Sequence, residues 1–125
     1  MYSIIKHYFD DDRFLHREDG PAVMYPNGDC SWYYHGQRHR EDGPAVITGN
    51  YQEWYHHGQL HRIGAPAVIE SNGDKHWFQH GKYHREDGPA IERSLGHQEW
   101  WLDDKRLEVS SQEEFERMMK LKAFW

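Results

Sequence analysis

Hydrophobic and polar positions follow a pattern along this chain that repeats itself. A short apolar run such as Ala22-Val23-Met24 is followed by a turn signal, and then by a second short run that contains a tryptophan. The segment His-Arg-Glu-Asp-Gly-Pro-Ala of residues 16–22 recurs, with changes in its third copy, at 39–45, 61–67 and 84–90. Self-similarity at a period of about 23 residues is typical of repeat proteins. We therefore predict four repeats over residues 16–107.

Each unit predicts two antiparallel strands joined by a tight turn. The first strand follows a proline, which suits the start of a strand. The turns carry Asn27-Gly28, Gly49-Asn50 and Asn72-Gly73, and these residue types tolerate the positive φ of hairpin turns. The second unit is one residue shorter, and we place the difference in its turn. A polar connection through His-Gly and His-Arg-Glu-Asp-Gly leads to the next unit.

The two ends of the chain depart from the repeat. Residues 1–15 predict a degenerate N-terminal half repeat, whose strand contains Ile4, Ile5, Tyr8 and Phe9. Residues 108–125 predict a C-terminal segment of a different kind. There, Ser110 or Ser111 suits a helix N-cap, and apolar residues from Phe115 onward have helical spacing, which predicts an amphipathic helix over 111–123. This helix either caps the open end of the sheet or binds a partner.

The fold class that follows is mainly β, a single-layer antiparallel meander of about four 23-residue hairpin repeats with a C-terminal amphipathic helix. Alternation along the second strands places two aromatic columns on opposite faces: Trp32, Trp54, Trp77 and Trp100 on one, and Tyr33, Tyr55, Phe78 and Trp101 on the other. A single layer must cover at least one such face, by curling, by helix packing or by a second chain. We therefore expect a homodimer or a tightly curled ribbon, with the tryptophans on the more buried face.

Composition narrows the possible partners. With 125 residues the chain is expected to form a single domain, and a net charge of -6 disfavours nucleic acid and acidic membranes, which attract basic proteins. Cys30 is the single cysteine, so the chain predicts neither an internal disulfide nor a cysteine-rich zinc site. We read no signal peptide and no run of the length that spans a membrane. The expected location is the cytoplasm, which is the host cytoplasm for a viral protein.

These units resemble the MORN repeat family, through their Trp-x-x-x-Gly segments, Asn-Gly turns and His-Arg connections. They resemble more closely the His-Arg-Glu-Asp-Gly-Pro-Ala variant found in phage and large-virus proteins. The resemblance covers about residues 7–107 and implies an antiparallel hairpin array. It also implies a scaffold whose partners are proteins or lipids. The chain departs from the usual pattern where Pro-Ala replaces a small glycine and where His35, His57 and His80 replace asparagine.

Eleven histidines raise the possibility of a metal site, above all the repeated His-Gly-x-x-His. Equivalent histidines of successive units lie about 10 Å apart in such a sheet, which is too far to share one ion. A structural role also suffices, because histidine tolerates left-handed turn geometry. The sequence therefore predicts no metal and no cofactor. It predicts no catalytic residue either, because the same groups are spread evenly along the chain instead of converging on one centre.

The third connection is irregular, since Ile63-Gly64-Ala65 replaces Glu-Asp-Gly. This is either drift in a tolerant loop or a local contact site. Interfaces draw most of their energy from a few aromatic and arginine side chains. We therefore expect the partner-binding residues to be Tyr33, Tyr55, Phe78, Trp101, Arg62 and Ile63. The expected function is a non-enzymatic protein-interaction module, a phage accessory protein that binds or inhibits a host protein such as a defence component. The alternative is a MORN-type module that binds a membrane surface or lipid head groups.

Overall fold

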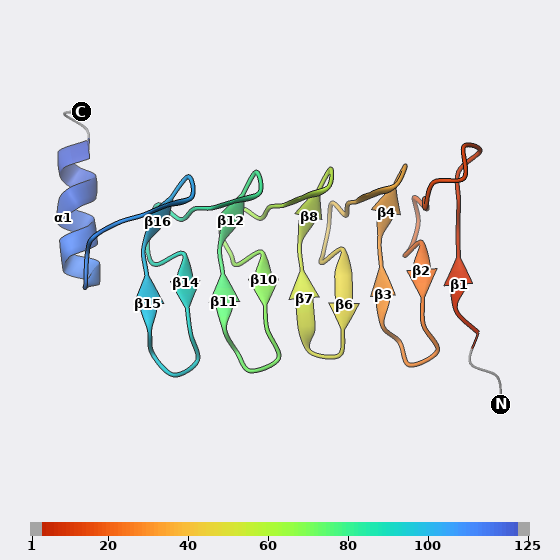
Figure 1. Cartoon of the computed structure of the whole chain (residues 1–125), viewed down its shortest axis with the longest axis horizontal. Helices are drawn as coiled ribbons and strands as arrows, with labels where there is room; N and C mark the ends of the chain where they lie inside the picture. Colours follow the sequence, from red (N-terminus) through yellow and green to blue (C-terminus); the bar gives the residue numbers. More distant parts are fainter. Residues whose placement is uncertain (1–3, 123–125) are drawn as a thin grey trace.

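A computed structural model of the chain describes residues 4–122 and shows a long, flat ribbon with one helix at its C-terminal end (Figure 1). Nine strands form one antiparallel sheet in the order β1-β2-β3-β6-β7-β10-β11-β14-β15. β1 is Lys6–His7, and the first strands of the four units are β2 (Val23–Met24), β6 (Val46–Thr48), β10 (Val68–Ile69) and β14 (Ile91–Glu92). The second strands are β3 (Cys30–Ser31), β7 (Tyr51–Glu53), β11 (Lys75–His76) and β15 (Gln98–Glu99). The predicted meander of hairpin repeats is confirmed.

The turns between first and second strands explain the unequal lengths of the units. In the first unit, Tyr25 and Asp29 are joined by a main-chain hydrogen bond across a three-residue loop that ends at Gly28, whose φ is 97°. In the second unit, Thr48 pairs with Tyr51, which leaves a two-residue loop. The residue that the second unit lacks is therefore missing from the turn, as the sequence predicts.

The polar connection between units contains a second, smaller hairpin, which the sequence analysis did not predict. The four small hairpins are β4–β5 (Tyr33–Tyr34 and Gln37–Arg38), β8–β9 (Tyr55–His56 and Gln59–Leu60), β12–β13 (Phe78–Gln79 and Lys82–Tyr83) and β16–β17 (Trp101–Leu102 and Lys105–Arg106). They stand in a row along one long edge of the ribbon (Figure 1). In the first, His35 and Gly36 have φ of 47° and 84°, which fits a two-residue turn with both residues left-handed.

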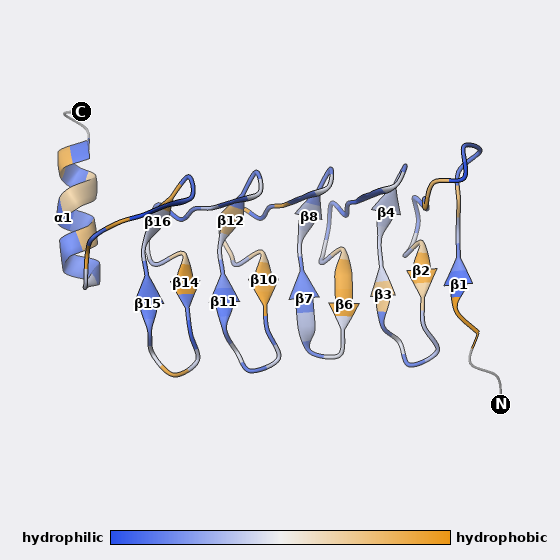
Figure 2. Cartoon of the chain, viewed as in Figure 1, coloured by the Kyte–Doolittle hydropathy of each residue, from blue (hydrophilic) through white to orange (hydrophobic). Residues whose placement is uncertain are grey.

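The hydrophobic core is a thin stripe across the nine-stranded sheet. Ala22, Ala45, Ala67 and Ala90, which precede the first strands, are all fully buried. The next residue of each unit, Val23, Val46, Val68 or Ile91, is also buried. From the second unit on, hydrophobic first strands alternate with polar second strands (Figure 2). So small a core leaves much of the stability to contacts between units.

One such contact explains the His-Arg-Glu-Asp-Gly-Pro-Ala segment. The guanidinium of Arg40 lies 4.0 Å from the ring centroid of Trp32 in the preceding unit, and Arg62 on Trp54, Arg85 on Trp77 and Arg17 on Tyr8 repeat the contact. Arg40 also donates to the Asp42 carboxylate and to the Pro44 carbonyl. A Cβ on Gly43 would lie 2.8 Å from the Arg40 guanidinium carbon, so a side chain at this position would displace the stacked guanidinium. The Asp, Gly and Pro of the motif therefore hold or make room for the stacked arginine.

The C-terminal helix α1 (Gln112–Lys122) covers the tryptophan that no following arginine reaches. Ser111 is its N-cap, because its hydroxyl accepts the main-chain N–H of Glu114. Phe115 packs 6.4 Å from the ring of Trp100, and the Trp100 indole donates to the Gln112 side chain. Trp100 is consequently 2% exposed. The predicted helix is confirmed over 112–122, and residue 123 lies outside the described part of the chain.

The tryptophan column is not uniformly the more buried face. Trp77 and Trp100 are buried, but Trp32 and Trp54 are half-buried, as are the four aromatic residues of the other column. At the N-terminal end, β1 and a bridge between Phe9 and Leu15 form a half unit, which no helix of residues 4–122 covers. Ile4, Phe9 and Phe14 are exposed there.

The helix contact predicts a large difference between two substitutions in α1. Phe115 is 1% exposed and Leu121 is 57% exposed. Phe115→Ala should lower the free energy of unfolding by about 3–5 kcal/mol, because it removes a buried aromatic ring and leaves a cavity over Trp100. Leu121→Ala should change it by less than about 0.5 kcal/mol. Urea denaturation of both variants measures the difference, and equal effects would contradict the assigned packing.

Because the sheet is a single layer, we still predict that the protein self-associates. The accessible surface is 8411 Å², whereas a compact protein of this mass exposes about 7,100 Å². Exposing this much surface favours association wherever the surface is apolar. Light scattering should give a dimer mass, twice 15.1 kDa. A monomer at all concentrations would refute this prediction.

Candidate functional site

The small hairpins are tied to one another by a histidine ladder, which we define as His16, His39, His61 and His84 together with the turn histidines His35, His57 and His80. In each step the Nδ1 of a connection histidine accepts the N–H of the first turn residue in the next small hairpin along the chain, as between His39 and His57 at 2.9 Å. The same bond joins His16 to His35, His61 to His80 and His84 to Asp103. The turn glycine donates to the unit before it as well, Gly58 to the Arg38 carbonyl at 2.8 Å.

The imidazole rings of the ladder also pack against one another. The rings of His16 and His35 and those of His39 and His57 stack, with centroids 4.0 Å and 4.3 Å apart, and those of His61 and His80 are tilted, with centroids 4.5 Å apart. The histidines that stand out in the sequence are those at equivalent positions and the pairs within one His-Gly-x-x-His segment. The contacts instead join a connection histidine to the turn histidine of the next small hairpin, 18 or 19 residues away, so the repeat pattern does not predict them.

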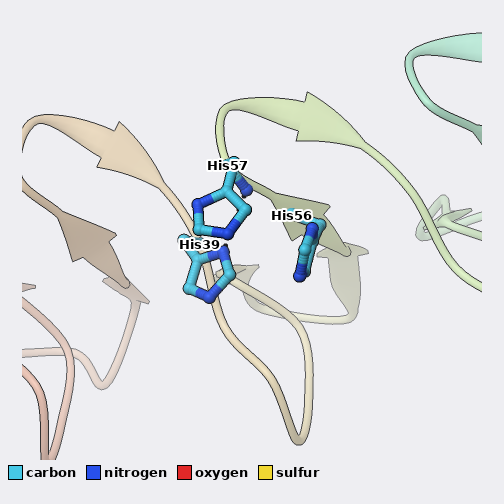
Figure 3. A group of neighbouring side chains, drawn as sticks. All are labelled: His39, His56 and His57. Carbon is cyan, nitrogen blue, oxygen red and sulfur yellow. Dashed lines mark hydrogen bonds between the residues drawn. The ribbon is translucent and has the colours of Figure 1, made fainter.

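The second step of the ladder differs from the others by one residue. His56 lies beside His39 and His57, and nitrogens from the three imidazoles all lie within 4.8 Å of one another (Figure 3). The positions equivalent to His56 hold Tyr34, Gln79 and Leu102. Glu41 contacts two of these rings, at 2.7 Å from His39 Nε2 and 3.6 Å from His56 Nε2.

The four aromatic residues predicted to bind a partner belong to the first strands of the small hairpins. Together with the residues that pair with them across each hairpin, they form the aromatic row: Tyr33, Arg38, Tyr55, Leu60, Phe78, Tyr83, Trp101 and Arg106. The ring of Tyr83 lies 4.2 Å from Phe78 and 5.2 Å from Trp101, so three rings are in contact across two units. All four predicted aromatic residues are half-buried.

Arg38 joins the first two tyrosines of the aromatic row. Its guanidinium donates to the hydroxyls of both Tyr33 and Tyr55, at 3.3 Å each. Burial acts to lower the pKa of Arg38, but these hydroxyls outweigh it and raise that pKa. Burial also raises the pKa of the Tyr55 hydroxyl. The row therefore carries a fixed positive charge within a half-buried aromatic surface.

Arg62, which the sequence predicted to bind a partner together with the four aromatic residues, is not part of the aromatic row. Its guanidinium lies 3.9 Å from the centroid of the Trp54 ring and donates to the Pro66 carbonyl. Tyr55, the next residue after Trp54, instead contacts Arg38. Arg62 therefore has the structural role of the other repeated arginines, and burial lowers its pKa.

The irregular third connection is explained by a coupled exchange. Ala65 stands where the other units have the glycine beneath the arginine, and Gly64 stands where they have aspartate. Gly64 has a φ of 81°, so the chain reaches the proline by a different path that leaves room for the Ala65 side chain. Ile63 is 69% exposed on this connection. A change in backbone path thus accounts for Gly64 and Ala65, but not for Ile63.

Two open grooves lie between successive connections, on either side of the second one. The larger, of about 610 Å³, has His39 and His57 in its wall, and the smaller has His56 and Ile63. Trp32 lines the first and Trp54 the second. The three clustered histidines therefore stand on the ridge between two solvent-filled grooves.

Comparisons with known proteins place this chain in no established group. No family model matches it, and neither the curated proteins nor the solved structures include a match. Within residues 4–122, α1 is too short and too polar to cross a bilayer.

The ladder predicts a dependence of stability on pH. Burial lowers the pKa of His61 below its ordinary value of 6.5, and the neighbouring His80 and His56 add to the effect. The folded state therefore binds fewer protons than the unfolded state just below pH 6.5, so stability is complete above that pH and falls as the pH drops toward the folded pKa. Protonation would also place a hydrogen on the Nδ1 that accepts the His80 N–H.

The test compares urea midpoints at about pH 7.5 and about pH 5, where carboxylates stay ionised. His61→Asn supplies a side-chain oxygen near the position of Nδ1 and does not titrate in this range. The wild-type protein should lose stability at the lower pH, and His61→Asn should lose less of it. An identical loss in both proteins would show that His61 does not contribute.

Proposed function

We propose that this chain is a non-enzymatic protein-binding module whose partner contacts the aromatic row. The observation that supports it best is the exposure of this row at the edge of a single-layer sheet. Half-buried tyrosine, phenylalanine, tryptophan and arginine side chains are the types that dominate the energy of protein interfaces. Within residues 4–122 no second layer covers the nine-stranded sheet.

The rigidity of the row favours the same proposal. Arg38 is held by two tyrosine hydroxyls, and the ring of Tyr83 packs against the rings of both Phe78 and Trp101. Side chains that are already ordered lose little conformational entropy when a partner binds. The resemblance of the repeats to those of phage and large-virus proteins makes a host protein the partner that we propose, and inhibition of that protein the outcome. The proposed site of action is the cytoplasm.

Substitutions in the aromatic row should weaken partner binding without unfolding the array. Tyr55→Ala or Phe78→Ala should cost about 2 kcal/mol or more of affinity if either residue is an energetic centre of the interface. Lys75→Ala is the matched control, because Lys75 is an exposed residue of the large sheet and lies outside the row. The measurement is affinity capture from a host lysate, with circular dichroism to verify folding.

Proteins that bind the wild-type chain and Lys75→Ala, but are lost with Tyr55→Ala and Phe78→Ala, would support the proposal. Capture that is unchanged by both aromatic substitutions would refute it. Vesicle flotation tests the alternative of a lipid-binding module. The net charge of -6 predicts no binding to anionic vesicles, and clear binding would favour the alternative.

A further inference from the structure

We propose that His39, His56 and His57 form a binding site for a divalent transition-metal ion, with Zn²⁺ as the ion to test first. The cluster contains no residue of the aromatic row, and this proposal does not depend on the proposed function. Imidazole nitrogen is a preferred ligand of Zn²⁺, Ni²⁺ and Cu²⁺, and three histidines with an open fourth position are a known type of Zn²⁺ site.

The distances suit an ion after small side-chain movements. Ligand nitrogens within 4.8 Å of one another surround a common point. Around Zn²⁺, with Zn–N distances of about 2.0–2.1 Å, tetrahedral ligand nitrogens lie about 3.4 Å apart. His56 and His57 are exposed and line open grooves, so their rings have room to turn toward a common ion.

His56 is the residue that separates this step of the ladder from the others. The positions of His39 and His57 hold histidine in other units for a structural reason, since the ladder bond needs an Nδ1 acceptor and a left-handed turn residue. The position of His56 carries no such requirement, because tyrosine, glutamine and leucine occupy it elsewhere. A third imidazole at a variable position therefore has no explanation in the fold, and a ligand role supplies one.

The hydrogen bonds indicate how His39 would take part. Its Nδ1 accepts the main-chain N–H of His57, so its Nε2 carries the hydrogen and donates it to Glu41. Binding an ion through Nδ1 exchanges that main-chain bond for a metal bond and leaves the Nε2–H to Glu41 intact. A carboxylate behind a metal-bound histidine is the usual outer partner, which fixes the ring and raises its basicity. The N–H of His57 is in an exposed turn, where water can replace the lost acceptor.

The chain provides a matched loss-of-site variant. His56→Gln places at this position the residue that the third unit already has in Gln79, so the fold should be unaffected. The wild-type protein should bind one Zn²⁺ per chain in calorimetry at neutral pH, and His56→Gln should bind at least about tenfold more weakly. Glu41→Gln should weaken binding by about 10- to 100-fold through the loss of the outer carboxylate. His97→Gln, which alters a histidine outside the cluster, should bind as the wild type does.

A transplant tests whether the three positions are sufficient. In the His56→Gln background, Gln79→His with Ile63→Glu builds the same set of groups around His61 and His80 in the third unit. This variant should regain one Zn²⁺ per chain. In the wild type, Zn²⁺ should also shift the main-chain amide resonance of His57, because its acceptor is exchanged.

Three results would overturn the proposal. They are the absence of saturable Zn²⁺ binding to the folded wild-type protein, equal affinity in His56→Gln, and a folded transplant variant that binds no ion. Circular dichroism of each variant separates a lost site from a lost fold. Because none of these readouts involves a protein partner, failure of the metal site and failure of the proposed function are distinguished.

Discussion

The turn of every small hairpin presents two main-chain N–H groups that no residue of its own hairpin accepts, and the rest of the array depends on where they go. In β8–β9 they are taken by the Nδ1 of His39 and by the carbonyl of Arg38, which lie at the end of the hairpin before, β4–β5. These two bonds fix each small hairpin against the segment that precedes it. Because the two bonds require a neutral imidazole on one side and left-handed residues on the other, they explain why histidine and His-Gly recur at this period.

The stacked arginine adds a second link in the same direction along the chain. Each guanidinium lies on the aromatic ring of the preceding unit and donates to its own proline carbonyl, and all but Arg62 also donate to an aspartate. Each tryptophan is covered by the arginine of the unit that follows it. The last unit is not followed by another, so its tryptophan must be covered in a different way. Phe115 and Gln112 of α1 take that place over Trp100. The N-terminal half unit lies at the other end of the array, where Ile4 and Phe9 are exposed.

The residues that form the contacts between units can be distinguished from the residues that are free to change. The connection histidines, the arginines and the turn residues serve the links between units, and their repetition reflects that shared requirement. Positions such as those of Tyr34 and His56 stand beside the ladder without being part of it. The aromatic row lies between these cases, because its rings pack on one another and still remain half-exposed. Specific binding is therefore best sought at unrepeated positions and along this row.

The sequence by itself determined the number of units, the strand and turn positions, the shorter turn of the second unit and the C-terminal helix. These follow from local rules: proline before a strand, Asn-Gly in a turn, and a serine cap before helical spacing. It did not predict the small hairpins, because a short polar stretch such as Gln37–Arg38 lacks the apolar alternation that identifies strands.

Only the tertiary structure decided which side chains meet. It separated Arg62 from the aromatic row by placing it on Trp54, and it brought His39, at the end of one small hairpin, into contact with His57 in the turn of the next. The physical reason is that successive small hairpins are offset, so a connection histidine contacts the turn of the next hairpin rather than its own equivalent. A repeat in the sequence shows which positions are equivalent, but the offset between neighbours arises only when the backbone hydrogen bonds form.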